Sequence, residues 1–323
     1  MLKLLFLCLA SLSLNLDATT LKIAALAPEG TTWAETLKKM AKEIENKTNG
    51  EVKIKLYMSG SQGDEPDVLR KIRVGQLQGG IFTGKTLGAI NGDARVMEIP
   101  FTFYDDNEKA YNTLNELEPH LNRGFKEKGF ENLGFYEIGN VYFVSQEKTE
   151  SLEELKGLKI WSWEGDRLVE AMIETLDLVS VPLPLPDVLS SLSTGVVKAA
   201  YAPPLGILAL QWSSEVKYLV DFPLSYSIGA FLVASKSWKK ISKENQKLVK
   251  EISKKYVLQV NKSNTLDNQE ALKAMENMGI KFLDFPEKDQ RKAKKIRKKI
   301  IEKLKGNLFS EKIYKRFKES LEK

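Results

Sequence analysis

The chain has 323 residues, which is long enough for two domains that each bury a sizeable core. Its formal net charge is +6, and its lysines are interleaved with glutamates, a pattern that favours solubility over nucleic-acid binding. Cys8 and His120 are its only cysteine and histidine, so Cys/His metal sites and catalysis by Cys/His or Ser/His/Asp are nearly excluded.

The N-terminus has the pattern of a secretory signal. Met1-Leu2-Lys3 supplies a charged start, and an apolar run follows over 4–14, shorter than the roughly 20 apolar residues that span a bilayer. We expect export to the periplasm, with residues 1–18 removed by cleavage near Ala18. Lipidation of Cys8 is a weaker alternative, because Leu7 occupies a position that calls for a small residue.

Strands and helices alternate after this signal. Strands are predicted at 21–26, 51–57 and 77–82, and helices at 31–48 and 64–74. This order indicates a parallel sheet with right-handed crossovers, which makes one α/β lobe. A helix over 106–125 carries His120 as a surface residue, and an extended segment over 132–145 then crosses toward a second lobe.

The alternation starts again after a helical turn at 151–155. Strands at 157–163, 179–183 and 196–202 are predicted to alternate with helices that open at Asp166 and Asp187. Two extended apolar segments, 217–220 and 225–234, return the chain to the first lobe. The helix predicted over 243–278 has no Pro or Gly, and its length is typical of a helix that bridges lobes.

These elements predict an α/β protein of two lobes. Lobe I comprises residues 19–143 and 225–260, and lobe II comprises residues 144–224 and 261–323. The last segment contains a strand over 280–285 and a lysine-rich helical region over 286–323. An apolar stripe of Ile296, Ile300 and Leu304 leaves its basic residues as a solvated face rather than a nucleic-acid site.

Trp161 and Trp163 mark the predicted ligand site. Residues alternate faces along a strand, so both rings project to the same side of the strand at 157–163. Ligands of open α/β sheets bind beyond the C-terminal strand ends, where Tyr201-Ala202-Pro203 ends a second strand. Burial of both rings in the core is the alternative.

Five motifs, in this order and spacing, resemble those of the solute-binding subunits of tripartite ATP-independent periplasmic (TRAP) transporters. They are Thr48-Asn49-Gly50-Glu51-Val52, Arg73-Val74-Gly75-Gln76-Leu77, Ile99-Pro100-Phe101, Leu155-Lys156-Gly157-Leu158-Lys159-Ile160 and Leu192-Ser193-Thr194-Gly195-Val196-Val197. The resemblance implies a two-lobed periplasmic binding protein that closes on a small-molecule ligand in its cleft. It also implies delivery of the ligand to two membrane subunits of a TRAP transporter, with no covalent chemistry and no cofactor.

The sequence departs from the resembled family at three polar ligand contacts. Most members carry an arginine that clamps a ligand carboxylate where this chain has Trp161. A second family arginine aligns near Asn140 or Val141, and a family asparagine aligns with Ala202. Because a desolvated carboxylate needs such a partner, we expect a ligand that is weakly polar or hydrophobic.

The predicted site combines an apolar slot with a few polar groups. The residues expected at the slot are Trp33, Phe82, Trp161, Trp163, Leu185, Pro203 and Tyr201, with Thr83, Asn140, Val141 and Ala202 beside them. Glu65 and Asp166 lie at helix starts facing the cleft, where each either caps its helix or contacts ligand. Among Arg70, Lys85 and Arg95, Lys85 is the best candidate for a replacement cation.

Three alternatives remain open at this point. The protein could bind a monocarboxylate through a non-standard anion contact, or it could present its closed state to a membrane receptor as a ligand-sensing subunit. It could also be an exported hydrolase that uses a carboxylate pair, although Asp64-Glu65 and Glu164 with Asp166 are the only candidates for that pair.

Overall fold

The computed structural model describes residues 18–104 and 106–323. The apolar run of the predicted signal and Cys8 lie outside the described residues. Within the described part, no helix combines the length and the apolar character needed to cross a membrane.

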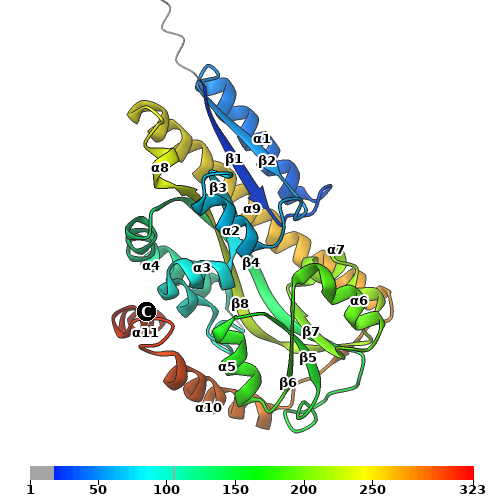
Figure 1. Ribbon diagram of the computed structural model, residues 1–323. Coiled ribbons are helices and arrows are strands. Elements are labelled where there is room, and N and C mark those ends of the chain that lie inside the picture. Colours follow the sequence, from blue (N-terminus) through cyan, green and yellow to red (C-terminus); the bar gives the residue numbers. More distant parts are fainter. Residues whose placement is uncertain (1–17, 105) are drawn as a thin grey trace, which may run out of the picture.

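One sheet runs through the whole molecule (Figure 1). Its strands are β1 (Thr19–Ala25), β2 (Val52–Tyr57), β3 (Gly79–Thr83), β4 (Phe130–Ser145), β5 (Lys159–Trp163), β6 (Val179–Leu183), β7 (Ala199–Ala202), β8 (Tyr218–Ala234) and β9 (Lys281–Leu283). Their order is β2-β1-β3-β8-β4-β7-β5-β6, and β9 pairs with β8. β1 pairs in parallel with β2 and β3, and β5 pairs in parallel with β6 and β7, which confirms the two predicted α/β units.

Two long antiparallel strands, β4 and β8, join these units. The segments 217–220 and 225–234, predicted to be extended, are both extended and are joined in the single strand β8. The ladder register shifts between the pairs Val141–Ser225 and Phe143–Val220. Pro223 falls within this irregularity, where its missing N–H does not interrupt a regular ladder.

Helices cover the sheet. They are α1 (Thr32–Lys47), α2 (Glu65–Arg73), α3 (Gly84–Ile90), α4 (Asn107–Glu127), α5 (Arg167–Thr175), α6 (Val188–Ser193), α7 (Pro204–Ala209), α8 (Ser235–Trp238), α9 (Lys243–Asn277), α10 (Glu287–Leu304) and α11 (Glu311–Leu321), with 3-10 turns η1 (Gly92–Glu98), η2 (Leu185–Asp187) and η3 (Trp212–Ser214). The short helices α3 and α7 were not predicted from sequence, and 151–155 forms turns rather than a helical turn.

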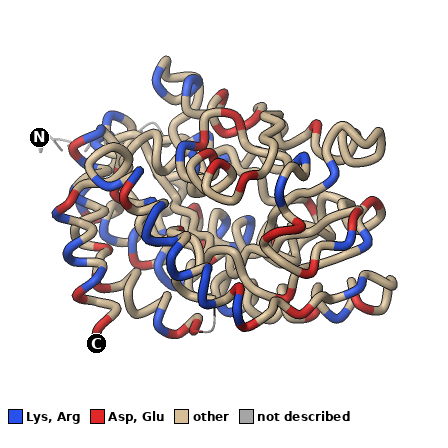
Figure 2. The backbone as a smooth tube through the Cα atoms, turned by 90° about the horizontal axis from the view of Figure 1, so that it is seen from below, with Lys and Arg blue, Asp and Glu red and all other residues tan. Residues whose placement is uncertain are grey.

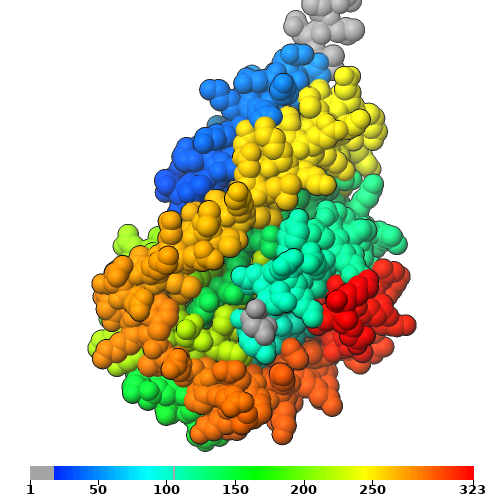
Figure 3. Space-filling model, turned by 180° about the vertical axis from the view of Figure 1, so that it is seen from behind, coloured from blue at the N-terminus to red at the C-terminus, as the bar shows by residue number. Residues whose placement is uncertain are grey.

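The long helix α9 crosses the back of the molecule diagonally (Figure 3). Its first half packs with α1 against the β1 unit, and its second half reaches α7 beside the β5 unit. Asn261 and Asn264 on its buried face donate from their side-chain amides to backbone carbonyls of β4. The helix is therefore anchored to a strand that both units share.

The two C-terminal helices pack on different units. α10 lies against α5, whereas α11 lies against α4 and η1, which belong to the lobe I predicted from sequence. Phe317 of α11 packs edge-on against Phe103 at a ring-centroid distance of 5.9 Å. Residues 287–323 contain fifteen basic and six acidic residues, a net charge of +9, so positive charge gathers on these helices (Figure 2).

Candidate functional site

A cavity of about 220 Å³ lies where the two α/β units meet. Trp33 from α1 and Thr83 at the end of β3 line one side, and Trp161 of β5 and Tyr201 of β7 line the other. The crossing strands contribute Val141. The cavity therefore lies at C-terminal strand ends, where ligands of parallel α/β sheets bind.

Eleven of the residues expected at the site line this cavity: Trp33, Glu65, Thr83, Val141, Trp161, Trp163, Asp166, Leu185, Tyr201, Ala202 and Pro203. Phe82 does not, because alternation along β3 turns Ile81 and Thr83 toward the cavity and Phe82 into the core, where it is fully buried. Asn140 is turned away in the same manner and lines a smaller pocket with Asn268, whereas its neighbour Val141 faces the cavity.

Aromatic rings form one wall of the cavity. Trp161 stacks on Tyr201 with ring centroids 4.9 Å apart and meets Trp212 edge-on at 5.3 Å. Its indole N–H donates to the carbonyl of Leu183 at 3.0 Å. Only 2% of Trp161 is exposed, so the ring is part of the core and of the wall, and its one polar atom is already satisfied.

Trp163 connects the two sides of the cavity. Its indole N–H donates to Oδ2 of Asp64 at 2.8 Å, although the two residues belong to different α/β units. Asp64 is also the N-cap of α2, since its side chain accepts from the backbone N–H of Glu65 at 2.8 Å. The Lys85 ammonium lies 5.3 Å from the centre of the Trp163 ring, within cation–π range.

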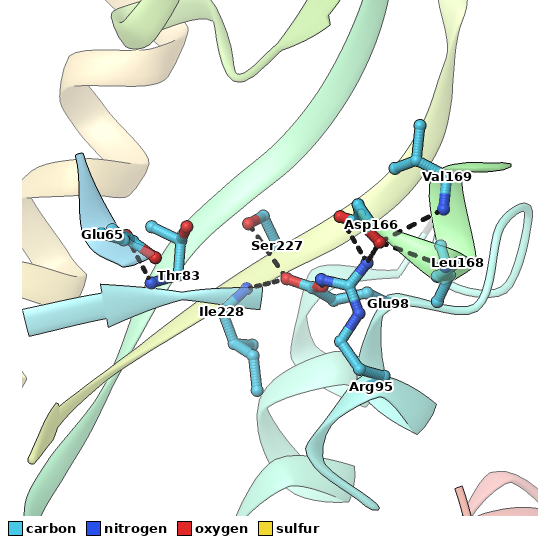
Figure 4. Close-up of polar contacts among 9 residues, drawn as sticks. All are labelled: Glu65, Thr83, Arg95, Glu98, Asp166, Leu168, Val169, Ser227 and Ile228. Carbon is cyan, nitrogen blue, oxygen red and sulfur yellow. Dashed lines mark hydrogen bonds and ion pairs between the residues drawn. The ribbon is translucent and has the colours of Figure 1, made fainter. Parts of the chain in front are cut away.

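A buried charge cluster of Arg95, Glu98 and Asp166 also lines the cavity (Figure 4). Nη2 of Arg95 donates to both oxygens of Asp166, at 2.7 and 2.9 Å, and Nη1 lies 2.5 Å from Oε2 of Glu98. Asp166 also caps α5 by accepting from the backbone N–H groups of Leu168 and Val169. The cluster is internally paired, because two carboxylates already contact the one guanidinium of Arg95.

The packing around this cluster explains a glycine in the sequence. A Cβ at Gly84 would lie 1.8 Å from Oε2 of Glu98 and 2.2 Å from Nη1 of Arg95. Any larger residue at the start of α3 would therefore displace the ion pair. Glu98 itself accepts from the backbone N–H of Ile228 and the hydroxyl of Ser227, and burial raises the pKa of its carboxyl.

Glu65 is the other buried acid of the cavity (Figure 4). It does not cap α2; its Oε1 accepts from the backbone N–H of Thr83 at 2.8 Å. Its Oε2 is buried and has no hydrogen-bond partner among the described residues. Burial raises the pKa of this carboxyl to about 7.

The candidate cations of the sequence differ in their positions. Arg70 is exposed and pairs with Asp67, outside the cavity lining. Arg95 lines the cavity but forms ion pairs with Glu98 and Asp166. Lys85 also lines the cavity, and it forms no ion pair with a described carboxylate. His120 lies away from the cavity, half-buried, with Nε2 2.9 Å from Asp93.

Sequence reasoning missed several residues of the cavity lining. They include Glu98, Leu205, Trp212, Ser225, Ser227 and Asn264. The i,i+3 spacing of Arg95 and Glu98 in η1 was a usable signal for a paired charge, but its partner Asp166 is 71 residues further along the chain. Within the described residues, no group of three or more His, Cys, Asp and Glu side chains could hold a metal ion.

Solved structures with the same fold cover nearly the whole chain. A TRAP periplasmic solute-binding protein from Desulfovibrio salexigens, with bound orotic acid, is 18% identical and has a TM-score of 0.85, covering 94% of this chain and 99% of its own. One from a Bradyrhizobium species, in complex with galacturonate, is 23% identical with the same TM-score and covers 94% and 100%. At these identities the likeness establishes the fold.

Sequence relatives match a shorter part of the chain. A solute-binding protein of Chromohalobacter salexigens is 24% identical over 221 residues, which is 67% of this chain and 65% of that protein. The sialic acid-binding periplasmic protein of Vibrio cholerae is 26% identical over 157 residues, 47% of each chain. The matches span 61% to 65% of the length of the first curated relatives.

The model of the bacterial extracellular solute-binding protein family 7, DctP, matches residues 23–307. Members of this family are binding proteins and not enzymes, which removes the hydrolase alternative. The chain therefore belongs to the DctP family and has the two-lobed α/β fold of TRAP periplasmic solute-binding proteins.

Proposed function

We propose that this protein is exported and captures a small, weakly polar organic solute in the cavity for delivery to the membrane subunits of a TRAP-type transporter. The observation that carries the proposal is Trp161. It stands where the resembled family has an arginine, its indole N–H is already bonded to Leu183, and its face stacks on Tyr201. The position thus offers apolar contact in place of an anion clamp.

The charged residues that line the cavity also favour a weakly polar solute over an acid. A ligand carboxylate would have to compete with Glu98 and Asp166 for Arg95, at a large desolvation cost. The similar proteins named above bind acids, namely orotic acid, galacturonate and sialic acid. Trp161 places an indole where the resembled family carries an arginine clamp, so we expect a less acidic solute for this chain.

Lys85 supports one alternative within the same function. It is the one cation of the described cavity lining that is not paired with a carboxylate, so a monocarboxylate could bind there. Such a solute would still place its apolar part against Trp161 and Tyr201. The membrane subunits and the uptake role are inferred from the family.

Identification of the solute that co-purifies with the full-length exported protein tests this proposal. Native mass spectrometry should show a bound small molecule, and its release and identification should give a compound with an apolar or aromatic body. A small dicarboxylate or a uronate in the cavity would contradict the weakly polar assignment while leaving the solute-binding role intact.

Tryptophan fluorescence gives a second test. Four of the five tryptophans, Trp33, Trp161, Trp163 and Trp212, line the cavity, so solute binding should change the emission. Trp161→Phe should weaken binding of the co-purifying solute by about tenfold, through loss of stacking area and of the Leu183 hydrogen bond. Trp238→Phe, at a buried tryptophan that is not part of the cavity lining, is the matched control. Unchanged affinity in Trp161→Phe would remove Trp161 from the site.

A further inference from the structure

The cavity contains one carboxylate that no side chain of the described protein neutralises. Glu65 is 1% exposed and lines the cavity between the α2 start and the end of β3. We propose that the solute carries a protonated nitrogen that pairs with the free oxygen of Glu65. This inference rests on the proposed solute-binding function; it keeps the apolar body of the solute but replaces a weakly polar head group with a cationic one.

The hydrogen bonding around Glu65 leaves a place for a donor. Oε1 is bonded to the backbone N–H of Thr83, and Oε2 has no partner among the described residues. The hydroxyls of Thr86 and Thr83 lie beside the carboxyl and act to lower its pKa against the effect of burial, but neither makes a hydrogen bond of normal geometry to it. A buried acceptor without a donor destabilises the protein, more so when it is charged, and a donor supplied by the solute removes that cost.

The charge balance of the cavity favours a cationic donor over a neutral one. The acids lining the cavity are Glu65, Glu98 and Asp166, and the cations are Lys85 and Arg95. Arg95 pairs with both Glu98 and Asp166, whereas Lys85 lies over the Trp163 ring and forms no ion pair with Glu65. With a neutral solute, Glu65 either takes up a proton or stays as a buried carboxylate without compensation. An anionic solute disfavours its ionised form further, whereas an ammonium group compensates the carboxylate.

The wall beside Glu65 suits the remainder of such a solute. The rings of Trp161, Trp163 and Tyr201 offer apolar area, and indole faces attract organic cations. The predicted class is therefore a small amine with an aromatic or aliphatic body. A carboxylate on the same molecule would have Lys85 within the same cavity as its partner.

Three probes with the same phenyl body separate the head-group classes. They are phenethylamine, which is a cation; phenylalanine, which is a zwitterion; and hydrocinnamate, which is an anion. Calorimetry on the full-length exported protein, freed of co-purifying solute by unfolding and refolding, should show that at least one of the two amines binds about tenfold or more tightly than hydrocinnamate at pH 8.

Binding of the amine should depend on pH through Glu65. The ionisable groups around it are Asp64 beside it in the chain, Lys85, and the Arg95, Glu98 and Asp166 cluster. With the pKa of free Glu65 near 7, an amine that requires the carboxylate should bind about tenfold more weakly at pH 6 than at pH 8. Glu65→Gln should remove this dependence and weaken amine binding at pH 8 about tenfold or more.

Two further variants complete the design. Glu164→Gln changes an exposed acid outside the cavity lining and should leave all affinities unchanged. Lys85→Met should spare phenethylamine but weaken hydrocinnamate, if the latter binds at all. Hydrocinnamate binding alone, lost in Lys85→Met, would overturn the amine assignment and retain the solute-binding function. Amine binding that is equal in wild type and Glu65→Gln would also overturn it. Binding of none of the probes would overturn the amine assignment as well, whereas the solute-binding function is tested separately by the co-purifying solute.

Discussion

The side chain of Glu65 is buried, and one of its two carboxyl oxygens has no hydrogen-bond partner among the described residues. The free energy of unfolding should therefore depend on pH. Its carboxyl has an ordinary pKa of 4.5, which burial raises to about 7 in the folded protein. Between these pH values the folded state holds the proton more tightly than the unfolded state. The stability should therefore fall as the pH rises from about 4.5 to about 7, by about 3 kcal/mol in total.

Glu65→Gln replaces the acid with a neutral group of the same shape and should remove this loss. The solute-free variant should be more stable than wild type at pH 8, by up to about 3 kcal/mol, and nearly equal to it at pH 4.5. Urea unfolding at the two pH values measures the difference, with Glu164→Gln as the exposed control. A variant that is less stable than wild type at pH 8 would mean that a donor absent from the described contacts already satisfies Glu65.

Residue-level prediction from sequence worked where one local rule decided the outcome. Strand alternation places Trp161 and Trp163 on one side, and the structure has both rings at the cavity. The same rule, applied to β3, separates Thr83 from Phe82, although both had been predicted at the site. Glu98 could not be found in this way, because its role depends on Arg95 reaching Asp166 across the fold.

At the scale of elements, asparagine side chains of α9 donate hydrogen bonds to backbone carbonyls of β4, as a neighbouring strand would. Asn268 donates to the carbonyl of Ile138 at 2.9 Å, and its Oδ1 accepts from the backbone N–H of Leu205 in α7 at 3.0 Å. One side chain thereby links a crossing strand, the long helix and the second α/β unit. Gly139 permits this contact, because it has a φ of 110° and a Cβ there would lie 2.9 Å from Nδ2 of Asn268.

Gly139→Ala should therefore destabilise the protein by about 1–3 kcal/mol, since alanine would be strained at this φ and would push Asn268 away. Denaturant unfolding measures the change. Gly206→Ala in α7 is the control: its Cβ would have no neighbour closer than 3.8 Å, so helix propensity should make that variant equally stable or slightly more stable. Equal stability of Gly139→Ala and wild type would show that Asn268 can move without cost.

The bounds of long periodic helices could be predicted well from the sequence, but the elements against which those helices pack could not. The apolar spacing of α1 and the unbroken run of α9 identified both helices to within about two residues, because period and caps are local. The packing of α11 on α4 could not be predicted from the sequence. The apolar spacing of Ile313 and Phe317 indicates that one face of α11 is buried, but it does not indicate which element covers that face. The lobe boundaries at 143/144, 224/225 and 260/261 therefore remain predictions.

At the scale of the whole molecule, β4, β8 and α9 join the two α/β units on one side of the cavity, while α10 and α11 pack against opposite units. On the cavity side, the Trp163 indole reaches Asp64 at 2.8 Å. This hydrogen bond has a carboxylate acceptor and joins residues that must separate if the cavity is to open. It should therefore slow the release of a bound solute.

Trp163→Phe keeps an aromatic ring in the wall but removes the N–H that reaches Asp64. Loss of a hydrogen bond to a carboxylate, worth about 1.5 kcal/mol, should raise the dissociation rate constant of phenethylamine about tenfold, while its association rate constant changes little. Stopped-flow fluorescence measures both rates, and Trp238→Phe again serves as the control. If dissociation is unchanged and only association slows, Trp163 acts on the entry of the solute, and the contact with Asp64 does not hold the cavity closed.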